Sequence, residues 1–311
     1  MSSTEYANAV AAVRAMECSL LTHGDIEQLI GASSVTELNA MLESKKVEHS
    51  SLDAVWEMLR SYAPESEELK ILLYRNDFHN LKAALKAMIS GKNGADYFIF
   101  PSNFEPGLIT DALVKKDYGE LPEYIGTAVE EAYDLLTKTL DGQLSDSFID
   151  AAALKAIQSA AEKLGSDFMR KYAELTTVCA DIKTAYRCSL MGKSRQFTEA
   201  ALCGSTALEK DVLIRASLEG TEALLSFLES TDYSEAADKL KESPAQFEKW
   251  CDDLLMELAE TARSNAFGYE PLAAYYIAKE AEIKNIRIIK VCRECGSDRG
   301  TVTERMRRLY V

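Results

Sequence analysis

The sequence predicts an all-α fold, and three observations support this prediction. Strong helix formers such as alanine, leucine, glutamate and lysine are abundant, and only 15 glycines and 6 prolines interrupt 311 residues. Apolar residues recur at intervals of three and four along most of the chain, whereas alternation with a period of two is scarce. Residues typical of helix caps mark the ends of several of these segments.

The expected helices follow one another with short connections. In the segment 66–90, apolar residues from Leu69 to Met88 fall largely on one face of a helix. Residues 96–104 (DYFIFPSNF) are the best strand candidate, but Pro101 interrupts them, so we expect an extended linker there. Similar helical patterns cover 122–141, 146–163, 166–190, 208–228, 244–265 and 271–295.

Start and stop residues support these boundaries. The segment 34–37 (SVTE) has the pattern of a capping box, and 243–246 (SPAQ) adds proline at the first helical position. The segment 301–304 (TVTE) predicts the start of a final short helix. Three glycines follow helical runs, as C-terminal stop residues do: Gly31, Gly204 and Gly296.

Composition narrows the class of protein. A length of 311 residues with 47% hydrophobic residues allows a sizeable core and two or three sub-domains. The net charge of −15 argues against general nucleic-acid binding and against direct adhesion to an anionic membrane. The chain has no long apolar run and no signal-peptide pattern, and its seven cysteines are dispersed. We therefore expect a cytoplasmic protein with reduced thiols.

Three of the expected helices have related sequences. They are DFHNLKAALKAMISG (77–91), DIKTAYRCSLMG (181–192) and EIKNIRIIKVCRECG (282–296), and their first acidic residues recur at intervals of roughly 100 residues. This repetition predicts three similar helical units. We place them at 1–104, 105–206 and 207–311.

Each repeat places an acidic residue one helical turn before a hydrogen-bonding residue, so the two side chains share a helix face. If three units pack around a pseudo-threefold axis, these faces would line or support a shared interior; an ordinary solvated charge stripe is the alternative. The C-terminal tail, residues 299–311 (RGTVTERMRRLYV), is rich in arginine. These arginines either interact favourably with the dipole at a helix end or form a docking site. The candidate partner-binding or inter-repeat residues are Asp77, Asn80, Lys82, Asp181, Thr184, Glu282, Asn285, Arg287, Arg305 and Arg308.

The sequence shows no catalytic grouping, metal site or cofactor motif. There are three histidines and no HExxH pattern, and no GxxxxGK[ST] or GxGxxG segment is present. Cys292 and Cys295 form a lone CxxC near the end of an expected helix, where the helix dipole disfavours a thiolate. The acidic pairs at 130–131 and 252–253 are expected to be solvated helix faces. The three histidines are His23, His49 and His79.

The C-terminal sequence resembles the C-subunit family of prokaryotic V-type (archaeal-type) ATP synthases, whose eukaryotic counterpart is the d subunit. The residues that carry this resemblance are EPLAAYYIAKEAEIKNIRIIKVCRECG, followed by VTERMRRLYV. The opening pattern with Tyr6 and Arg14 and the DxxNLK segment at 77–82 are also similar to the family. Thr184 stands where the DxxN pattern has asparagine, so the middle third departs from the family pattern.

The resemblance implies a non-catalytic rotor subunit with three similar helical domains arranged as a funnel. By this resemblance, the funnel would receive the central shaft, formed by the D and F subunits, and its other side would sit on the cytoplasmic face of the membrane rotor ring. Torque would pass through it between proton or sodium translocation and ATP turnover. Two other hypotheses remain: a generic helical-repeat adaptor for other proteins, and a helical enzyme that uses Cys292 or Cys295.

Overall fold

The computed structural model describes residues 6–45, 51–63 and 66–311, and every regular element in these ranges is a helix. The all-α prediction is confirmed. Among these residues, no helix combines the length and the apolarity needed to cross a bilayer.

The contacts divide the chain into two compact units. The first consists of Met1–Leu69 together with Lys239–Val311, and the second is Lys70–Asp238. The boundaries fall inside two short helices, α5 (Glu67–Lys70) and α14 (Glu235–Glu242).

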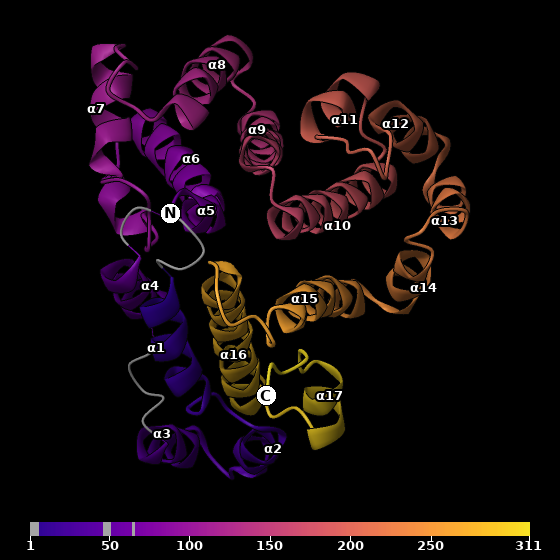
Figure 1. Cartoon of the computed structure of the whole chain (residues 1–311). Helices are drawn as coiled ribbons and strands as arrows, with labels where there is room; N and C mark the ends of the chain where they lie inside the picture. The colour runs from indigo at the N-terminus through magenta and orange to yellow at the C-terminus, as the bar shows by residue number, and fades with distance from the viewer. Residues whose placement is uncertain (1–5, 46–50, 64–65) are drawn as a thin grey trace. The chain divides into compact units, whose positions relative to one another are not determined.

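The first unit is built around the long helix α16 (Glu270–Glu294). In Figure 1, α16 runs between α1 (Ala7–Glu17) and α15 (Pro244–Thr261), and it contacts both. One end of α16 packs into an apolar cluster that includes Leu29, Ile289 and Val302. The other helices of this unit are α2 (His23–Gly31), α3 (Val35–Ser44), α4 (Leu52–Tyr62) and α17 (Arg299–Glu304).

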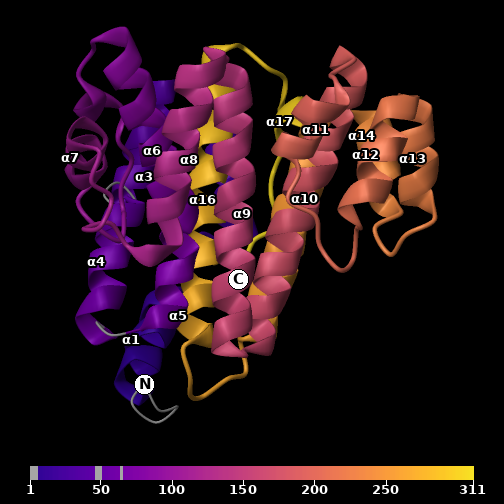
Figure 2. The same cartoon turned by 90° about the horizontal axis from the view of Figure 1, so that it is seen from above.

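The second unit is organised by α9 (Gly142–Leu164), which contacts α6 (Tyr74–Ser90), α8 (Glu123–Thr139) and α10 (Asp167–Met191). Figure 2 shows α9 between α8 and α10. One core cluster of this unit joins Phe78, Ile125 and Ile149, which are almost completely buried. The remaining helices are η1 (Ile71–Leu73), η2 (Gly94–Tyr97), α7 (Gly107–Lys115), α11 (Arg195–Ala201), α12 (Lys210–Glu219) and α13 (Thr221–Glu229).

Most expected helices are present, but some boundaries differ from the prediction. The pattern over 208–228 is two helices, because Gly220 adopts φ 121°, a conformation outside the helical region that glycine tolerates. Residues 96–104 begin in η2 and continue without regular structure from Phe98, so the extended linker is confirmed only for that later part.

The caps follow the sequence in part. Ser243 accepts a hydrogen bond from the amide of Gln246, as expected. The start predicted at 301 is wrong: α17 begins at Arg299, because the carboxylate of Asp298 caps it by accepting the amide of Thr301. Gly31 is the last residue of α2 and is followed by Ala32 as its cap, so it is not the stop residue expected there.

Candidate functional site

The acidic residue of the first repeat is buried and holds the segment that follows its helix. The carboxylate of Asp77 on α6 accepts hydrogen bonds from the amide of Asn103 at 3.0 Å, from Nδ2 of Asn103 at 2.7 Å and from the hydroxyl of Tyr124 at 2.6 Å. Burial raises the pKa of Asp77 to about 6, although these hydrogen bonds act to lower it. The ring of Tyr124 stacks on Tyr74, with centroids 3.9 Å apart.

Asn80, one turn further along α6, holds the same segment by both groups of its amide. Its Nδ2 donates to the carbonyl of Ile99 at 3.0 Å, and its Oδ1 accepts the amide of Ile99 at 2.8 Å. Asn80 and Asp77 together therefore hydrogen-bond the returning backbone at 99–103, which has no regular secondary structure to satisfy its polar groups.

Asp181 on α10 has the corresponding role in the second repeat. Its two carboxylate oxygens accept the amides of Cys203 at 2.9 Å and of Gly204 at 2.6 Å. Burial raises the pKa of Asp181 to about 6 as well. Gly204 has φ 82°, and a β-carbon there would lie 2.7 Å from Cβ of Lys210, so the backbone conformation at this position depends on glycine.

Thr184, the residue that departs from the repeat, is half-buried. The carbonyl of Gly204 is instead bound by Nε2 of Gln158 on α9, at 2.9 Å. The middle repeat thus holds its returning segment with an acid from the long helix and an amide from a neighbouring helix.

The third repeat has a buried acid that accepts a backbone amide and an asparagine that binds a returning segment, and it adds a buried ion pair. One oxygen of Glu282 accepts the amide of Leu21 at 2.7 Å, and the other lies 2.5 Å from Nζ of Lys279. Both charged side chains are at most 5% exposed. Asn285 binds the amide of Arg307 at 2.8 Å and its carbonyl at 3.1 Å, in the same two-point geometry that Asn80 uses.

The structure therefore gives equivalent contacts to residues that the repeat places in register. Asn80 and Asn285 each bind both backbone groups of one returning residue, and the three acids are each buried against backbone amides. Because these polar atoms form their hydrogen bonds within the chain, they are suited to fixing the segments that build a partner-binding surface. A direct contact with a partner at these positions stays a prediction.

The basic candidates fall into two groups. Lys82 pairs with Asp150 on α9 at 2.5 Å, and Arg308 pairs with acids of α15. Arg287 and Arg305 are exposed. Lys82 and Arg287 match when the repeats are set in register but lie in different surroundings, because Lys82 pairs with Asp150 of α9 and Arg287 is exposed.

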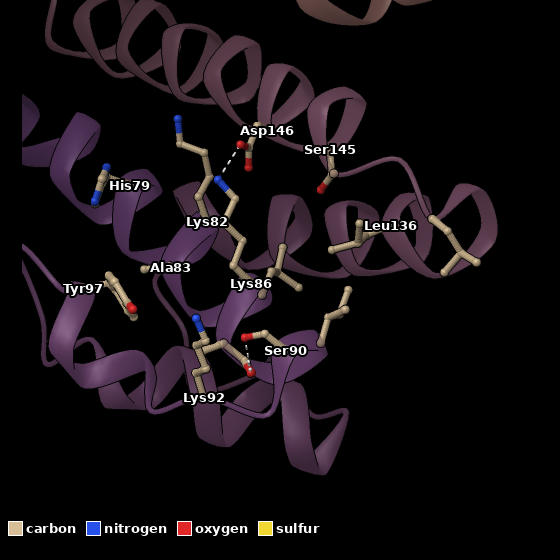
Figure 3. A pocket seen from close by; sticks show the side chains of 15 residues that line it. His79, Lys82, Ala83, Lys86, Ser90, Lys92, Tyr97, Leu136, Ser145 and Asp146 are labelled. Atoms are coloured by element: carbon tan, nitrogen blue, oxygen red, sulfur yellow. Dashed lines mark hydrogen bonds and ion pairs between the residues drawn. The ribbon is translucent and has the colours of Figure 1, made fainter.

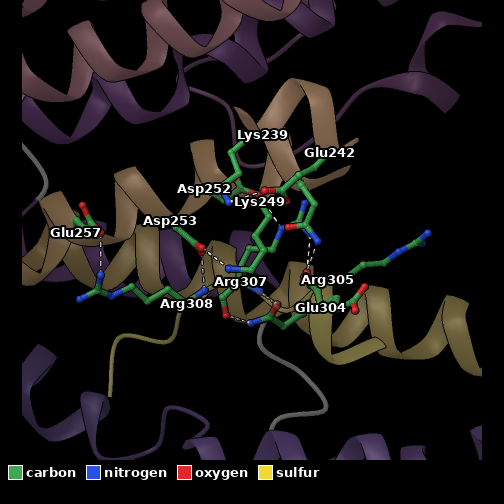
Figure 4. Close-up of polar contacts among 12 residues, drawn as sticks. Lys239, Glu242, Lys249, Asp252, Asp253, Glu257, Glu304, Arg305, Arg307 and Arg308 are labelled. Atoms are coloured by element: carbon green, nitrogen blue, oxygen red, sulfur yellow. Dashed lines mark hydrogen bonds and ion pairs between the residues drawn. The ribbon is translucent and has the colours of Figure 1, made fainter. Parts of the chain in front are cut away.

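The C-terminal tail lies on an acidic face of α15, as Figure 4 shows. Nε of Arg307 is 2.9 Å from Asp252, and the amide of Arg308 donates to Asp253 at 2.7 Å. The guanidinium of Arg308 donates to Glu260 through two nitrogens, at 2.9 and 2.7 Å, and to Glu257 at 2.8 Å.

The expectation that Asp252 and Asp253 form a solvated helix face is therefore wrong. Their side chains are mostly covered, because the tail binds both of them and the lysines Lys284 and Lys249 pair with Asp252 and Asp253, respectively. A spacing signal for this contact exists in the sequence, since Asp253, Glu257 and Glu260 share one helix face and the tail is basic in an acidic chain.

Among the residues that the structure describes, no three His, Cys, Asp or Glu side chains are grouped so that they could hold a metal ion. Cys292 is buried in the apolar cluster of the first unit, and Cys295 is exposed beyond it. His23 begins α2, His79 lies on α6, and His49 lies outside the described residues.

Comparison with known proteins assigns the chain to a protein family. A family model described as ATP synthase (C/AC39) subunit matches residues 49–305. The chain belongs to this family. The resemblance seen in the sequence is thus confirmed, and the match spans both compact units of this C/AC39 chain.

Relatives of this C/AC39 chain are distant but cover most of its length. The C subunit of the V-type sodium ATPase of Enterococcus hirae is 26% identical, over 98% of this chain and 99% of the relative. The C subunit of the A-type ATP synthase of Thermococcus kodakarensis is 23% identical over 91% of this chain and 85% of the relative. The C subunit of the V-type ATP synthase of Thermus thermophilus is 23% identical over 76% and 73%, respectively.

Arg308 gives a test of the tail contact. Because its ion pairs are half-exposed, we expect Arg308→Ala to lower the free energy of unfolding by no more than about 1 kcal/mol at low salt, and by less at high salt. Hydrogen exchange in the tail should become faster. Arg305→Ala is the matched control, since Arg305 is an exposed arginine of the same tail, whereas the ion pairs with Glu257 and Glu260 come from Arg308. Equal effects of both substitutions would contradict the contact.

The raised pKa of Asp181 predicts a pH effect. The folded state binds the proton more tightly than the unfolded state, whose pKa lies near 3.8, so this group makes the protein more stable as the pH falls through 6. We expect wild type to gain about 1 kcal/mol over Asp181→Asn between pH 7 and pH 5.

Urea unfolding at the two pH values measures this difference between wild type and Asp181→Asn. The comparison cancels His79, whose lowered pKa acts in the opposite direction in both proteins. The range from pH 5 to pH 7 also lies above the unfolded-state pKa values of carboxyls whose pKa is lowered in the folded state, such as Asp25 and Glu174, so these groups stay largely ionised throughout. A difference that does not change with pH would contradict the assignment.

Proposed function

We propose that this chain is the non-catalytic central-stalk subunit of a rotary V-type ATPase or ATP synthase. It links the shaft, formed by the D and F subunits, to the membrane rotor ring and transmits torque between ion translocation and ATP turnover. The family match over residues 49–305 carries this proposal. The chain would then lie on the cytoplasmic side, peripheral to the membrane, and would be held there by the complex.

Three similar helical domains, at 1–104, 105–206 and 207–311, would form a funnel around a pseudo-threefold axis and seat the shaft. The equivalent contacts of Asn80 and Asn285, and of Asp77 and Asp181, support a common origin of these domains. A torque-transmitting body must resist deformation. Long helices whose connecting segments are fixed by buried hydrogen bonds suit that requirement, because interiors packed in this way transmit strain.

Burial separates the candidate residues by role. Asp77, Asp181 and Glu282 would set the shape of the funnel from inside each domain, because they are almost completely covered. Arg287 and Arg305 are exposed and are the better candidates for contact with the shaft or the ring. Charge at such positions sets the register and the rate of docking more than the final affinity.

Reconstitution of the complex tests the function. Without this chain, the catalytic part should still hydrolyse ATP but should no longer drive ion transport, and adding the chain back should restore coupling. Full coupling in its absence would overturn the proposal. Co-purification with proteins unrelated to a rotary ATPase, and not with the D and F subunits, would favour a generic helical adaptor.

Arg287→Glu tests the proposed partner surface. We expect the variant to fold normally, because Arg287 is exposed, and to be retained less well in the reconstituted complex. Glu282→Lys is unsuitable for this purpose, since Glu282 is buried and its reversal would disturb folding. Circular dichroism of Arg287→Glu provides the folding control, and unchanged retention would exclude Arg287 from the interface.

A further inference from the structure

The second unit contains a cavity of about 700 Å³ that the function proposed above does not use. It lies beside the C-terminal half of α6, between η2 and the corner that joins α8 to α9, as Figure 3 shows. Leu85, Ala87 and Leu136 are buried apolar residues in its lining. The volume is in the range of ligand-binding pockets in proteins.

Large apolar side chains are exposed around this cavity. Leu140 is 80% exposed, and Ile89 and Tyr97 are each 54% exposed. Leu140 also has φ 55°, a left-handed conformation that is unfavourable for a leucine, and this conformation ends α8. Apolar groups that gather around a hollow and remain in contact with water typically mark an interaction site.

The charge of the lining is opposite to that of the whole chain. Lys82, Lys86 and Lys92 contribute three cations, whereas Asp146 contributes one anion, in a chain with a net charge of −15. Asp146 accepts from Lys86 at 2.5 Å, and Asp150 accepts from Lys82 at 2.5 Å. These two pairs hold the lysines along the α6–α9 edge, and Lys92 is exposed just beyond the end of α6.

We propose that this cavity is a docking site for an acidic amphipathic helix of a protein partner. Apolar residues of that helix, spaced by three and four, would contact Leu85, Leu136 and Ile89. Its carboxylates would face Lys92, which is exposed just beyond the end of α6. Asp150 and Asp146 neutralise Lys82 and Lys86, so Lys92 supplies the remaining positive charge of the lining. This charge favours an acidic partner over a basic one, because like charges at an interface are strongly unfavourable.

Two fluorescently labelled peptides test the site in the full chain. One carries leucines on one helical face and glutamates on the other, and the second carries lysines in place of the glutamates. Fluorescence anisotropy should show saturable binding of the acidic peptide that weakens with salt. The basic peptide should show only non-saturable association with the acidic surface.

Substitutions locate the binding. Lys92→Glu should weaken binding of the acidic peptide by about tenfold or more while leaving the Lys82–Asp150 and Lys86–Asp146 pairs in place. Leu140→Ser should weaken it without any change in charge. Lys171→Glu is the control, because Lys171 is an exposed lysine of α10 that does not line the cavity, and it should bind as wild type does.

Two results would overturn the proposal. One is equal binding of the acidic peptide by wild type and by the Lys92→Glu and Leu140→Ser variants. The other is saturable binding of oleate that Lys92→Glu abolishes, with no binding of the peptide, which would make the cavity a site for a small anionic amphiphile. Neither result depends on the rotary function, because the measurement uses the isolated chain.

Discussion

Glu282→Ala is expected to lower the free energy of unfolding of the first unit by about 3–5 kcal/mol. The substitution leaves the ammonium of Lys279 in an almost completely buried position without its partner, and it removes the acceptor of the Leu21 amide. A buried charge that loses its partner is among the most destabilising changes that a single substitution makes. Urea unfolding measures the loss, and Trp56 and Trp250 both report on this unit.

A double variant distinguishes the cost of leaving one buried charge unpaired from the cost of losing the whole ion pair. Lys279→Met combined with Glu282→Leu removes both charges, so the double variant should be more stable than Glu282→Ala, although the Leu21 amide still lacks its acceptor. Glu280→Ala is the matched control, since this partly exposed acid of α16 should cost less than about 1 kcal/mol. A loss no larger for Glu282→Ala than for Glu280→Ala would show that the buried pair contributes little.

Local patterns in the sequence predict the helices well because the signals that start and stop a helix are local. Apolar spacing, the Ser243 cap and the left-handed glycine after α16 act within a few residues of one another. The boundaries that differ have local causes as well. Asp298 is a stronger cap than the hydroxyl expected at Thr301, and Gly220 divides one apolar pattern into two helices.

The repeat predicts which residues are equivalent but not what they contact. Asn80 and Asn285 are in register and bind returning segments in the same way, because a similar connection follows each helix. Glu282 departs from Asp77 and Asp181, since its amide partner comes from Leu21, 261 residues away in the sequence. A contact at that distance depends on which helices pack together, and helical spacing contains no information about it.

Burial of charge is the other property that sequence patterns miss. Asp252 has the composition and spacing of a solvated acid, yet it binds Lys284 and Arg307. The deciding element is the segment 305–311, which follows α17 without regular secondary structure and therefore gives no periodic signal. Charge matching between an acidic helix face and a basic tail is the only indication that the sequence offers, and it does not distinguish this tail from a docking site for a partner.

Asp77→Ala is expected to destabilise the second unit by about 3 kcal/mol or more. The amide of Asn103 and the hydroxyl of Tyr124 lose their acceptor, and Nδ2 of Asn103 keeps the carbonyl of Lys70. Each buried polar group left unsatisfied costs about 1–3 kcal/mol. The effect should appear in urea unfolding followed by circular dichroism. Hydrogen exchange should also become faster in the segment 98–104, which Asp77 and Asn80 hold in place.

Tyr124→Phe provides the comparison that tests this explanation. It removes one of the three donors and keeps the aromatic ring on Tyr74, so it should cost about 1 kcal/mol and leave exchange in 98–104 nearly unchanged. Asp77 would then act mainly through the backbone of the returning segment. If the two substitutions cost the same and neither changes exchange in 98–104, the carboxylate serves only to satisfy the Tyr124 hydroxyl, and the shared role of the repeated acids would have to be abandoned.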